Sequence, residues 1–187
     1  GHYEVRLAPL PPDTLVTYSV NAGILTSGVS TFRSAPAYDQ PVRFLLFSDA
    51  HDNATYLPPI IAAGLEAGVD FAVSVGDTVP TPTEEHMASF FAMVRPLGQH
   101  VTLWPTLGNH EGIATPIYFQ SYVVPGAAPA PIPERFYSVR IGNLWMASLD
   151  LTDFYVAHMS QSSTIETRWL AEVLASPAAT SASYRLL

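Results

Sequence analysis

The sequence predicts an α/β fold built on a parallel or mixed sheet, preceded by a short segment rich in β-structure. From residue 40 onward, short apolar runs alternate with segments of helical periodicity, which is the pattern of strands joined by helical crossovers. Residues 1–36 show two-residue alternation and turn signals instead. Hydrophobic residues make up 48% of the 187 residues, which is enough for a buried core and excludes a disordered chain.

The N-terminal segment contains three short candidate strands. Apolar and polar residues alternate over 3–7 and over 15–20, and a third strand is expected to begin at Thr31. Three strands are too few to form a sandwich by themselves. The residues around Pro36 are expected to act as a linker to the rest of the chain.

The first three strands of the second part are placed at 43–47, Phe71–Val75 and 101–104, because each is a short apolar run. A helix is expected over Leu57–Ala67, between the first two strands. Its two prolines are tolerated only in a first turn, and Gly68 suits a C-terminal cap.

A second helix is expected to start at a capping box formed by residues 81–84, with proline at the first helical position. Behind this box, four apolar residues recur at the spacing of a stripe that faces a core. They are Met87, Phe90, Phe91 and Val94.

The second half of the chain is expected to add a hairpin, a helix and a strand. The hairpin pairs 136–141 with 144–149 across a Gly-Asn turn. A capping box at 163–166 opens a helix that ends near Ser176, and another strand begins at Tyr184.

A proline-rich stretch over 116–133 is expected to form an irregular surface loop. Three aromatic residues, Tyr118, Phe119 and Tyr122, lie in it. Their side chains either contact a ligand or anchor the loop on the core, and the sequence leaves both alternatives open.

The composition excludes several classes of site and partner. The absence of cysteine excludes disulfides, thiolate zinc sites and cysteine nucleophiles. The 16 acidic residues outnumber the 8 basic ones, which are all arginine, so the net charge is −8 and no nucleic-acid-binding surface is expected. No apolar run approaches the roughly 18 residues of a membrane-spanning helix, so no membrane span is expected.

Polar side chains able to bind metals follow three of the predicted strands directly. They lie in Asp49-Ala50-His51, in Gly76-Asp77 and in Gly108-Asn109-His110-Glu111. Because ligands of an open α/β sheet bind at the carboxyl ends of the strands, these segments are expected to converge. Carboxylate, imidazole and amide oxygen together suit Mn²⁺, Fe or Zn²⁺ better than Ca²⁺. The central carboxylate is placed to bridge two ions, as in sites that activate a hydroxide for phosphoryl displacement.

In this order and at this spacing, the three segments resemble the signature of the calcineurin-like metallophosphoesterases, D-x-H, G-D and G-N-H-[DE]. The predicted hairpin that ends in Leu149-Asp150, and the following helix with Trp169-Leu170, are also similar to the family's later chain. The resemblance covers residues 42–187 and implies the N-terminal part of an α/β sandwich. It also implies an enzyme that hydrolyses phosphate mono- or diesters.

The resemblance implies two divalent metal ions, Mn, Fe or Zn, with a hydroxide between them as the nucleophile. Asp49, His51 and Asp77 would bind the first ion. Asp77 would be shared with the second ion, which Asn109 would also bind. In purple acid phosphatases a tyrosine follows the Gly-Asp motif and binds ferric iron, but this chain has Pro80 there. A plain divalent pair is therefore expected.

The resemblance places His110 outside the metal shell, where it would donate to the phosphate or protonate the leaving oxygen. Glu111 would support His110. The substrate would be a small-molecule or extracellular phosphoester.

The family supplies further histidine ligands from later motifs, whereas no histidine follows His158 in this chain. The chain is therefore expected to be a fragment cut at both ends, with about half of the ligands, weak metal binding and little turnover. The alternative is a catalytically inactive scaffold or binding module. His158 is expected to be a loop histidine rather than a replacement ligand, and His2, His86 and His100 are expected on the surface.

The N-terminal segment resembles the end of a fibronectin type III-like domain, as found ahead of the catalytic domain in purple acid phosphatases and related secreted phosphoesterases. The matching stretches are 10–18 and 31–36. The resemblance implies the last strands of such a β-sandwich over 1–36 and a metallophosphoesterase domain over 41–187. It also implies a secreted or periplasmic location.

Overall fold

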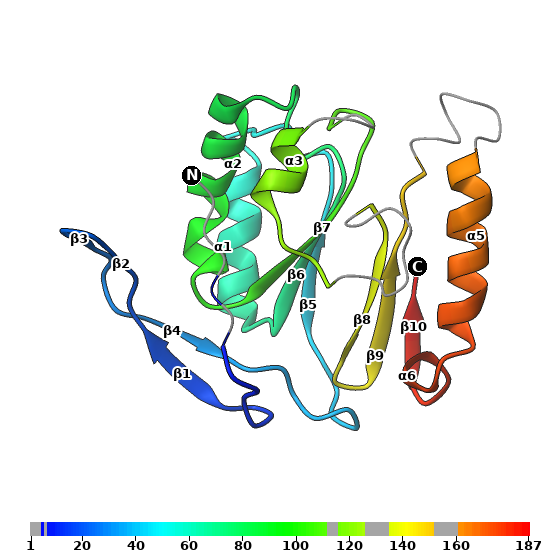
Figure 1. Cartoon of the computed structure of the whole chain (residues 1–187). Helices are drawn as coiled ribbons and strands as arrows, with labels where there is room; N and C mark the ends of the chain where they lie inside the picture. The colour runs from blue at the N-terminus through cyan, green and yellow to red at the C-terminus, as the bar shows by residue number, and fades with distance from the viewer. Residues whose placement is uncertain (1–4, 6, 112–115, 126–134, 152–160) are drawn as a thin grey trace.

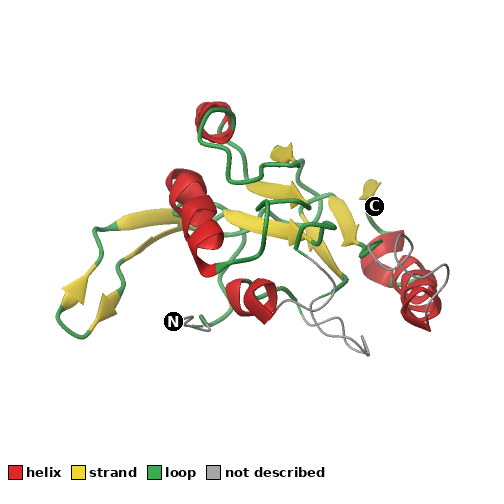
Figure 2. Ribbon diagram, turned by 90° about the horizontal axis from the view of Figure 1, so that it is seen from above, coloured by secondary structure: helices red, strands yellow, loops and turns green. Residues whose placement is uncertain are grey.

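The computed structural model describes residues 5, 7–111, 116–125, 135–151 and 161–187. Within them, two three-stranded sheets lie face to face with helices on the outer side of each, so that this part of the chain has four layers (Figure 1). A narrow N-terminal ribbon projects away from the layers (Figure 2). The predicted α/β class is confirmed.

The first sheet has three parallel strands in the order β5-β6-β7. In register, Phe44 lies beside Phe71, and Phe71 lies beside Thr102. Two helices make the crossovers. The elements are β5 (Phe44–Phe47), α1 (Leu57–Ala67), β6 (Phe71–Val75), α2 (Glu84–Gly98) and β7 (Thr102–Thr106).

Helix α1 has the predicted bounds, and Gly68 ends it with a left-handed φ of 62°. Helix α2 begins at Glu84, so the prediction that a capping box starts at Thr81 is wrong. Thr83 is the N-cap, and its hydroxyl accepts the backbone N–H of His86 at 3.2 Å. The threonine that directly precedes the helix satisfies the free N–H, which leaves no capping role for the threonine two residues before it.

The second sheet has the order β10-β9-β8. Strands β8 (Tyr137–Ile141) and β9 (Leu144–Ser148) form the predicted antiparallel hairpin, and β10 (Tyr184–Leu186) pairs with β9 in parallel. Two helices, α5 (Gln161–Leu174) and the short α6 (Pro177–Thr180), lie outside this sheet.

The capping box predicted at 163–166 is wrong, because α5 already begins at Gln161. Glu166 therefore lies inside the helix. Its carboxylate accepts the backbone N–H of Asp150 at 2.6 Å, which connects α5 to the end of β9. A tertiary contact thus uses the side chain that the local pattern assigned to a cap.

Alternation along β6 explains the layers. Phe71 and Val73 pack against the second sheet, with Tyr137 and Met146 among their neighbours, whereas Ala72 packs against α1 and α2. A third apolar cluster, including Trp145, fills the space between the second sheet and α5. Strand β6 is thus buried on both faces, as expected for the centre of a parallel sheet.

Part of the proline-rich stretch is helical, as α3 (Pro116–Ser121). Tyr118 is 2% exposed and Tyr122 is 8% exposed, and both belong to the core beneath α1 and α2. Phe119 packs against the same core. The structure therefore favours anchoring over ligand contact for these aromatic residues.

The N-terminal ribbon pairs β1 (Leu15–Tyr18) with β4 (Ser30–Arg33) in antiparallel orientation, and β2 (Asn21–Ala22) with β3 (Leu25–Thr26) at its tip. It contacts the end of α2 through two hydrogen bonds. The hydroxyl of Tyr18 donates to the Gln99 carbonyl at 3.0 Å, and His100 Nδ1 lies 2.7 Å from the Thr31 carbonyl.

Some expectations fall outside the described residues, namely His2, His158 and most of the strand expected at 3–7. The two described residues of that strand, Val5 and Leu7, are not in a strand. Among the residues that the structure describes, no helix combines the length and apolar character needed to cross a membrane.

Candidate active site

The loops that follow β5 and β6 stay paired beyond the ends of the two strands. Three backbone hydrogen bonds of 2.9–3.3 Å join them, from Asp49 to Gly76, from His51 to Asp77 and from Asp52 to Thr78. This pairing brings the first two metal-binding motifs together at the carboxyl edge of the sheet, where the strand order predicted them.

Four residues of these loops have a left-handed backbone although none of them is glycine. The φ angles are 51° at Asp49, 45° at His51, 45° at Asp52 and 49° at Asp77. This conformation costs free energy for residues with a side chain, and such residues cluster at functional sites.

Two glycines allow the loops after β6 and β7 to touch through their backbones. Gly76 has a φ of 70°, and a Cβ there would lie 2.8 Å from the Cα of Gly108. A Cβ on Gly108 would collide with the carboxylate and backbone nitrogen of Asp77. The glycines of the second and third motifs are therefore required by this close approach.

One group of metal-capable side chains forms within the described part of the chain. It contains His51, Asp77 and His110, whose ligand atoms all lie within 4.8 Å of one another. The two imidazole rings meet edge to face, with centroids 4.5 Å apart and planes at 84°. Each of the three residues comes from a different motif, so all three motifs converge.

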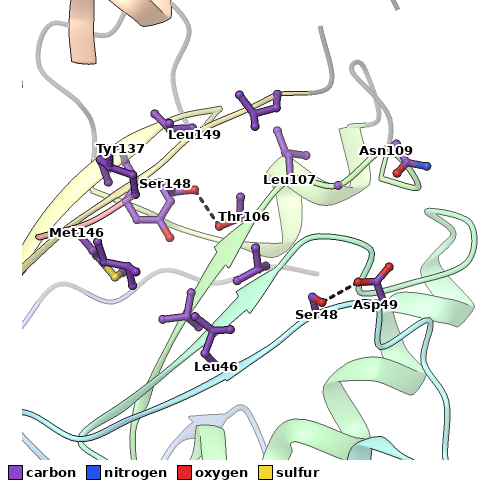
Figure 3. A pocket seen from close by; sticks show the side chains of 17 residues that line it. Leu46, Ser48, Asp49, Thr106, Leu107, Asn109, Tyr137, Met146, Ser148 and Leu149 are labelled. Atoms are coloured by element: carbon purple, nitrogen blue, oxygen red, sulfur yellow. Dashed lines mark hydrogen bonds between the residues drawn. The ribbon is translucent and has the colours of Figure 1, made fainter. Parts of the chain in front are cut away.

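Asp49 and Asn109 line a cavity of about 710 Å³ beside this group (Figure 3). Asp49 is 69% exposed; its Oδ2 accepts the Ser48 hydroxyl at 2.6 Å, and its Oδ1 lies 3.9 Å from His51 Nε2. Most other lining residues are apolar and come from both sheets, among them Leu46 and Met146. The polar groups are thus confined to the strand ends.

His110 is held at two atoms by the loop after β6. Its backbone N–H donates to Asp77 Oδ1 at 2.9 Å, and its Nδ1 lies 2.8 Å from the carbonyl oxygen of Pro80. A carbonyl only accepts, so Nδ1 carries the proton. The neutral ring therefore keeps the lone pair on Nε2, which is the usual arrangement of a histidine that serves a metal site.

Glu111 is fully buried, and its carboxylate accepts five hydrogen bonds. Oε2 accepts the backbone N–H groups of Asp77 and Gly108, at 3.0 and 2.8 Å. Oε1 accepts the N–H and hydroxyl of Thr78, at 2.6 and 2.7 Å, and the N–H of Val79 at 3.3 Å. The side chain of Glu111 holds the backbone of Asp77, whose own carboxylate accepts the backbone N–H of His110.

The three motifs lie within a region of the chain that matches a known family. The model of the calcineurin-like phosphoesterases matches residues 42–174, which include all three motifs. The chain belongs to the calcineurin-like phosphoesterase family. The resemblance suggested by the motifs is thereby confirmed.

The fold of this phosphoesterase chain is shared by a solved purple acid phosphatase, and a second solved structure is similar to a lesser degree. A purple acid phosphatase from yellow lupin (Lupinus luteus) seeds has a TM-score of 0.66 and 18% identity, covering 88% of this chain and 35% of that one. A dimetal phosphatase from Danio rerio has a TM-score of 0.44 and 14% identity, covering 72% of this chain and 52% of that one. The chain thus spans about a third of the length of the lupin enzyme. No curated protein sequence matches it.

The calcineurin-like phosphoesterase family implies the use of divalent metal, and the donors present in this chain fit such an ion. The group formed by His51, Asp77 and His110 combines imidazole nitrogens with a carboxylate oxygen. These donors suit zinc, manganese and iron.

One contact at this edge was not predicted from the sequence. His86, in the first turn of α2, was expected on a solvated face, but its Nδ1 lies 3.1 Å from Asp52 Oδ2. Asp52 is only 16% exposed and directly follows His51. No sequence signal joins these residues, because 34 positions separate them.

Proposed function

We propose that this chain carries the metal-binding edge of a phosphoester hydrolase, which cleaves phosphate mono- or diesters with the help of two divalent ions. The observation that carries the proposal is the convergence of His51, Asp77 and His110, from three motifs, on one edge of the sheet. The family match over these motifs supports the same reaction class.

We assign Asp49, His51 and Asp77 to the first ion, and Asp77 together with Asn109 to the second. Asp49 and Asn109 both line the cavity beside the metal-capable group, which supports their inclusion. When bound, the two ions would activate a water molecule for attack on phosphorus and neutralise the charge of the phosphate. They are Mn, Fe or Zn.

His110 would handle the proton of the leaving group. The Pro80 carbonyl holds the Nδ1 proton, so Nε2 is the nitrogen that faces the reaction. After taking up a proton from solvent at Nε2, the ring would be an imidazolium that hydrogen-bonds a phosphate oxygen or donates this proton to the leaving oxygen. Glu111 would support this arrangement because it accepts a hydrogen bond from the Asp77 backbone. The Asp77 carboxylate in turn accepts the backbone N–H of His110.

The substrate would be a small-molecule or extracellular phosphoester, and the protein would be secreted or periplasmic. The purple acid phosphatase-like fold supports a phosphoester substrate. The proposed location rests on the resemblance of the sequence to secreted phosphoesterases. We also propose that the antiparallel ribbon belongs to a fibronectin type III-like sandwich over 1–36, ahead of the phosphoesterase domain over 41–187. The pairing of β1 with β4 is compatible with such a sandwich.

Hydrolysis of p-nitrophenyl phosphate and of bis-p-nitrophenyl phosphate, each with added Mn²⁺, tests the proposal and separates monoester from diester activity. In keeping with the partial ligand set predicted from the sequence, we expect only weak turnover, which EDTA abolishes and Asp77→Ala lowers to background. Asp39→Ala, at an exposed position, is the matched control.

Turnover that survives both EDTA and Asp77→Ala would overturn the proposal. Binding of Mn²⁺ that depends on Asp77, without any turnover, would instead favour the alternative of an inactive metal-binding scaffold.

A further inference from the structure

We propose that Glu111 is a positioning residue whose buried carboxylate acts as an internal anion, holding Asp77 in its left-handed conformation and so aiming its side chain at the metal. This proposal rests on the proposed function only in one respect, namely that Asp77 is a metal ligand. We call the hydrogen bonds that the Glu111 carboxylate accepts from the two loops the clamp, and they are present in the chain without metal.

The surroundings of Glu111 form an anion site. Four backbone N–H groups and one hydroxyl point at its two oxygens, from both the loop after β6 and the loop after β7. Successive N–H groups that converge in this way create a concave site for negative charge. Such a site can bind an anion, and here the chain supplies its own carboxylate.

All five partners of Glu111 are hydrogen-bond donors, so the side chain at this position must accept at both of its terminal atoms. A carboxylate does so, whereas the NH₂ group of a glutamine would face backbone N–H groups and could not accept from them. Asp77 and Gly108 both donate to Oε2, so a single oxygen joins the two loops. Loss of that oxygen leaves at least one buried N–H without an acceptor.

The clamp acts on the strained part of Asp77. Its backbone, with a φ of 49°, needs compensation from the surrounding structure. The hydrogen bond from the Asp77 N–H to Glu111 supplies it on one side, and the one from His51 N–H to the Asp77 carbonyl, at 3.0 Å, supplies it on the other. Asp77 Oδ1 in turn accepts the N–H of His110, so the clamp sets two side chains of the metal-capable group.

The residues around the Glu111 carboxylate are buried: Thr78 and Val79 are fully buried, and Tyr122 is 8% exposed. Burial raises the pKa of Tyr122 far above its ordinary value, and the negative charge of Glu111 raises it further. A carboxylate in such surroundings is screened little by solvent, so its hydrogen bonds to the loops are strong.

The chain offers a matched control for this carboxylate. Glu166 is also buried, at 6% exposure, and also accepts a backbone N–H, that of Asp150. It lies behind the second sheet, on α5. A change at Glu166 therefore reproduces the loss of a buried carboxylate without touching the loops around Asp77.

The test compares Glu111→Gln with Glu166→Gln by two measurements on the full chain. Amide hydrogen exchange, followed by NMR without metal, reports on the N–H groups of Asp77, Thr78 and Gly108. Titration with Co²⁺, followed by its visible absorption, reports the metal affinity. For Glu111→Gln we expect exchange at these amides to accelerate at least about tenfold and Co²⁺ affinity to fall about 10–100-fold. The amides of the β8–β9 hairpin should keep their wild-type rates.

Glu166→Gln should leave Co²⁺ affinity and the three amides unchanged. A second variant, Glu111→Ala, opens an anion-sized hole, and added formate should restore part of the Co²⁺ affinity if the carboxylate acts only by position.

The proposal is overturned if Glu111→Gln keeps wild-type exchange at the three amides. It is also overturned if exchange accelerates throughout the chain or the variant does not fold, because Glu111 would then be a general determinant of stability. Absence of Co²⁺ binding by the wild-type chain would refute the proposed function instead, and the amide exchange would still decide on the clamp.

Discussion

His110 donates its Nδ1–H to the carbonyl oxygen of Pro80 at 2.8 Å. A side-chain carboxylate in that place would be open to substitution and to protonation, whereas a backbone carbonyl is not. The orientation of the ring and its tautomer are therefore built into the path of the chain after β6. This fixed ring is the basis of the first prediction.

Replacing His110 by alanine should lower kcat for p-nitrophenyl phosphate by about 100–10,000-fold, the usual contribution of a general acid. Because the proposal places the ring outside the metal shell, Mn²⁺ affinity should change much less than kcat. Steady-state kinetics and isothermal titration calorimetry measure the two effects. His100→Ala, at an exposed histidine that contacts Thr31, is the control. An equal loss of metal affinity would show that His110 is a metal ligand instead.

Replacing Asp77 by asparagine should weaken Mn²⁺ binding by more than the roughly 10–100-fold that loss of a supporting residue costs. The reason is that Asp77 is assigned to both ions and is the one carboxylate in the metal-capable group. Calorimetric titration checks this, with Asp39→Asn beside it. Unchanged affinity in the Asp77 variant would exclude it as a ligand.

Gly108→Ala should destabilise the fold by about 1–3 kcal/mol, because the added methyl group collides with Asp77 and overpacks the contact between two loops. Gly98→Ala is the matched control, since a Cβ there meets no atom within 4 Å and the residue ends a helix. Urea unfolding compares the two free energies of unfolding. Equal values would mean that the loops move apart without cost.

The two arginine–aspartate ion pairs of the described residues should differ strongly in value. Arg135 donates to Asp150 at 2.6 Å, and both side chains are buried, so Arg135→Ala should cost about 3–5 kcal/mol. Arg33 and Asp13 are 53% and 70% exposed, so Arg33→Ala should cost about 0–1 kcal/mol. Chemical denaturation measures both, and a similar cost at the two positions would contradict the prediction.

Stability should fall in alkaline solution because of buried tyrosines. Burial raises the pKa of Tyr118, Tyr122 and Tyr137 well above the ordinary 10.0. The unfolded chain loses these protons above about pH 10 while the folded chain keeps them, so their stabilisation is complete below that pH and is lost as pH rises.

Each buried tyrosine should add about 1.4 kcal/mol per pH unit to the alkaline slope of the free energy of unfolding. Urea unfolding between about pH 9 and about pH 11 measures the slope. Tyr122→Phe should reduce the alkaline slope by the contribution of one titrating group. An unchanged slope would exclude Tyr122 as a contributor.

Helices and strands were predictable from the sequence where the residues at their ends favour only one local conformation. Two prolines and Gly68 defined α1, and the Gly-Asn turn defined the hairpin of β8 and β9. The start of α2 was not predictable to the residue, because Thr81 and Thr83 are both good caps and only the folded backbone selects one. Glu166 failed as a cap for a different reason, since its partner, Asp150, comes from another element.

The site was predictable to the same extent. The order of the motifs on successive strands was enough to expect His51 and Asp77 side by side. The left-handed backbone of Asp77 and the five partners of Glu111 depend on how two loops approach each other, which no local pattern encodes. The same holds for the contact of His86 with Asp52.

Helix α2 makes one contact near each of its ends, so its length sets the distance between the two contacts. Its first turn meets Asp52, next to the metal-capable group, and the residue after its last turn, Gln99, receives the Tyr18 hydroxyl from the ribbon. An α-helix of 15 residues is about 22 Å long, so α2 is a rigid spacer between these contacts. The ribbon is thereby kept one helix length away from the metal-capable group, so that its contact with α2 orients it without bringing it to the carboxyl edge of the first sheet.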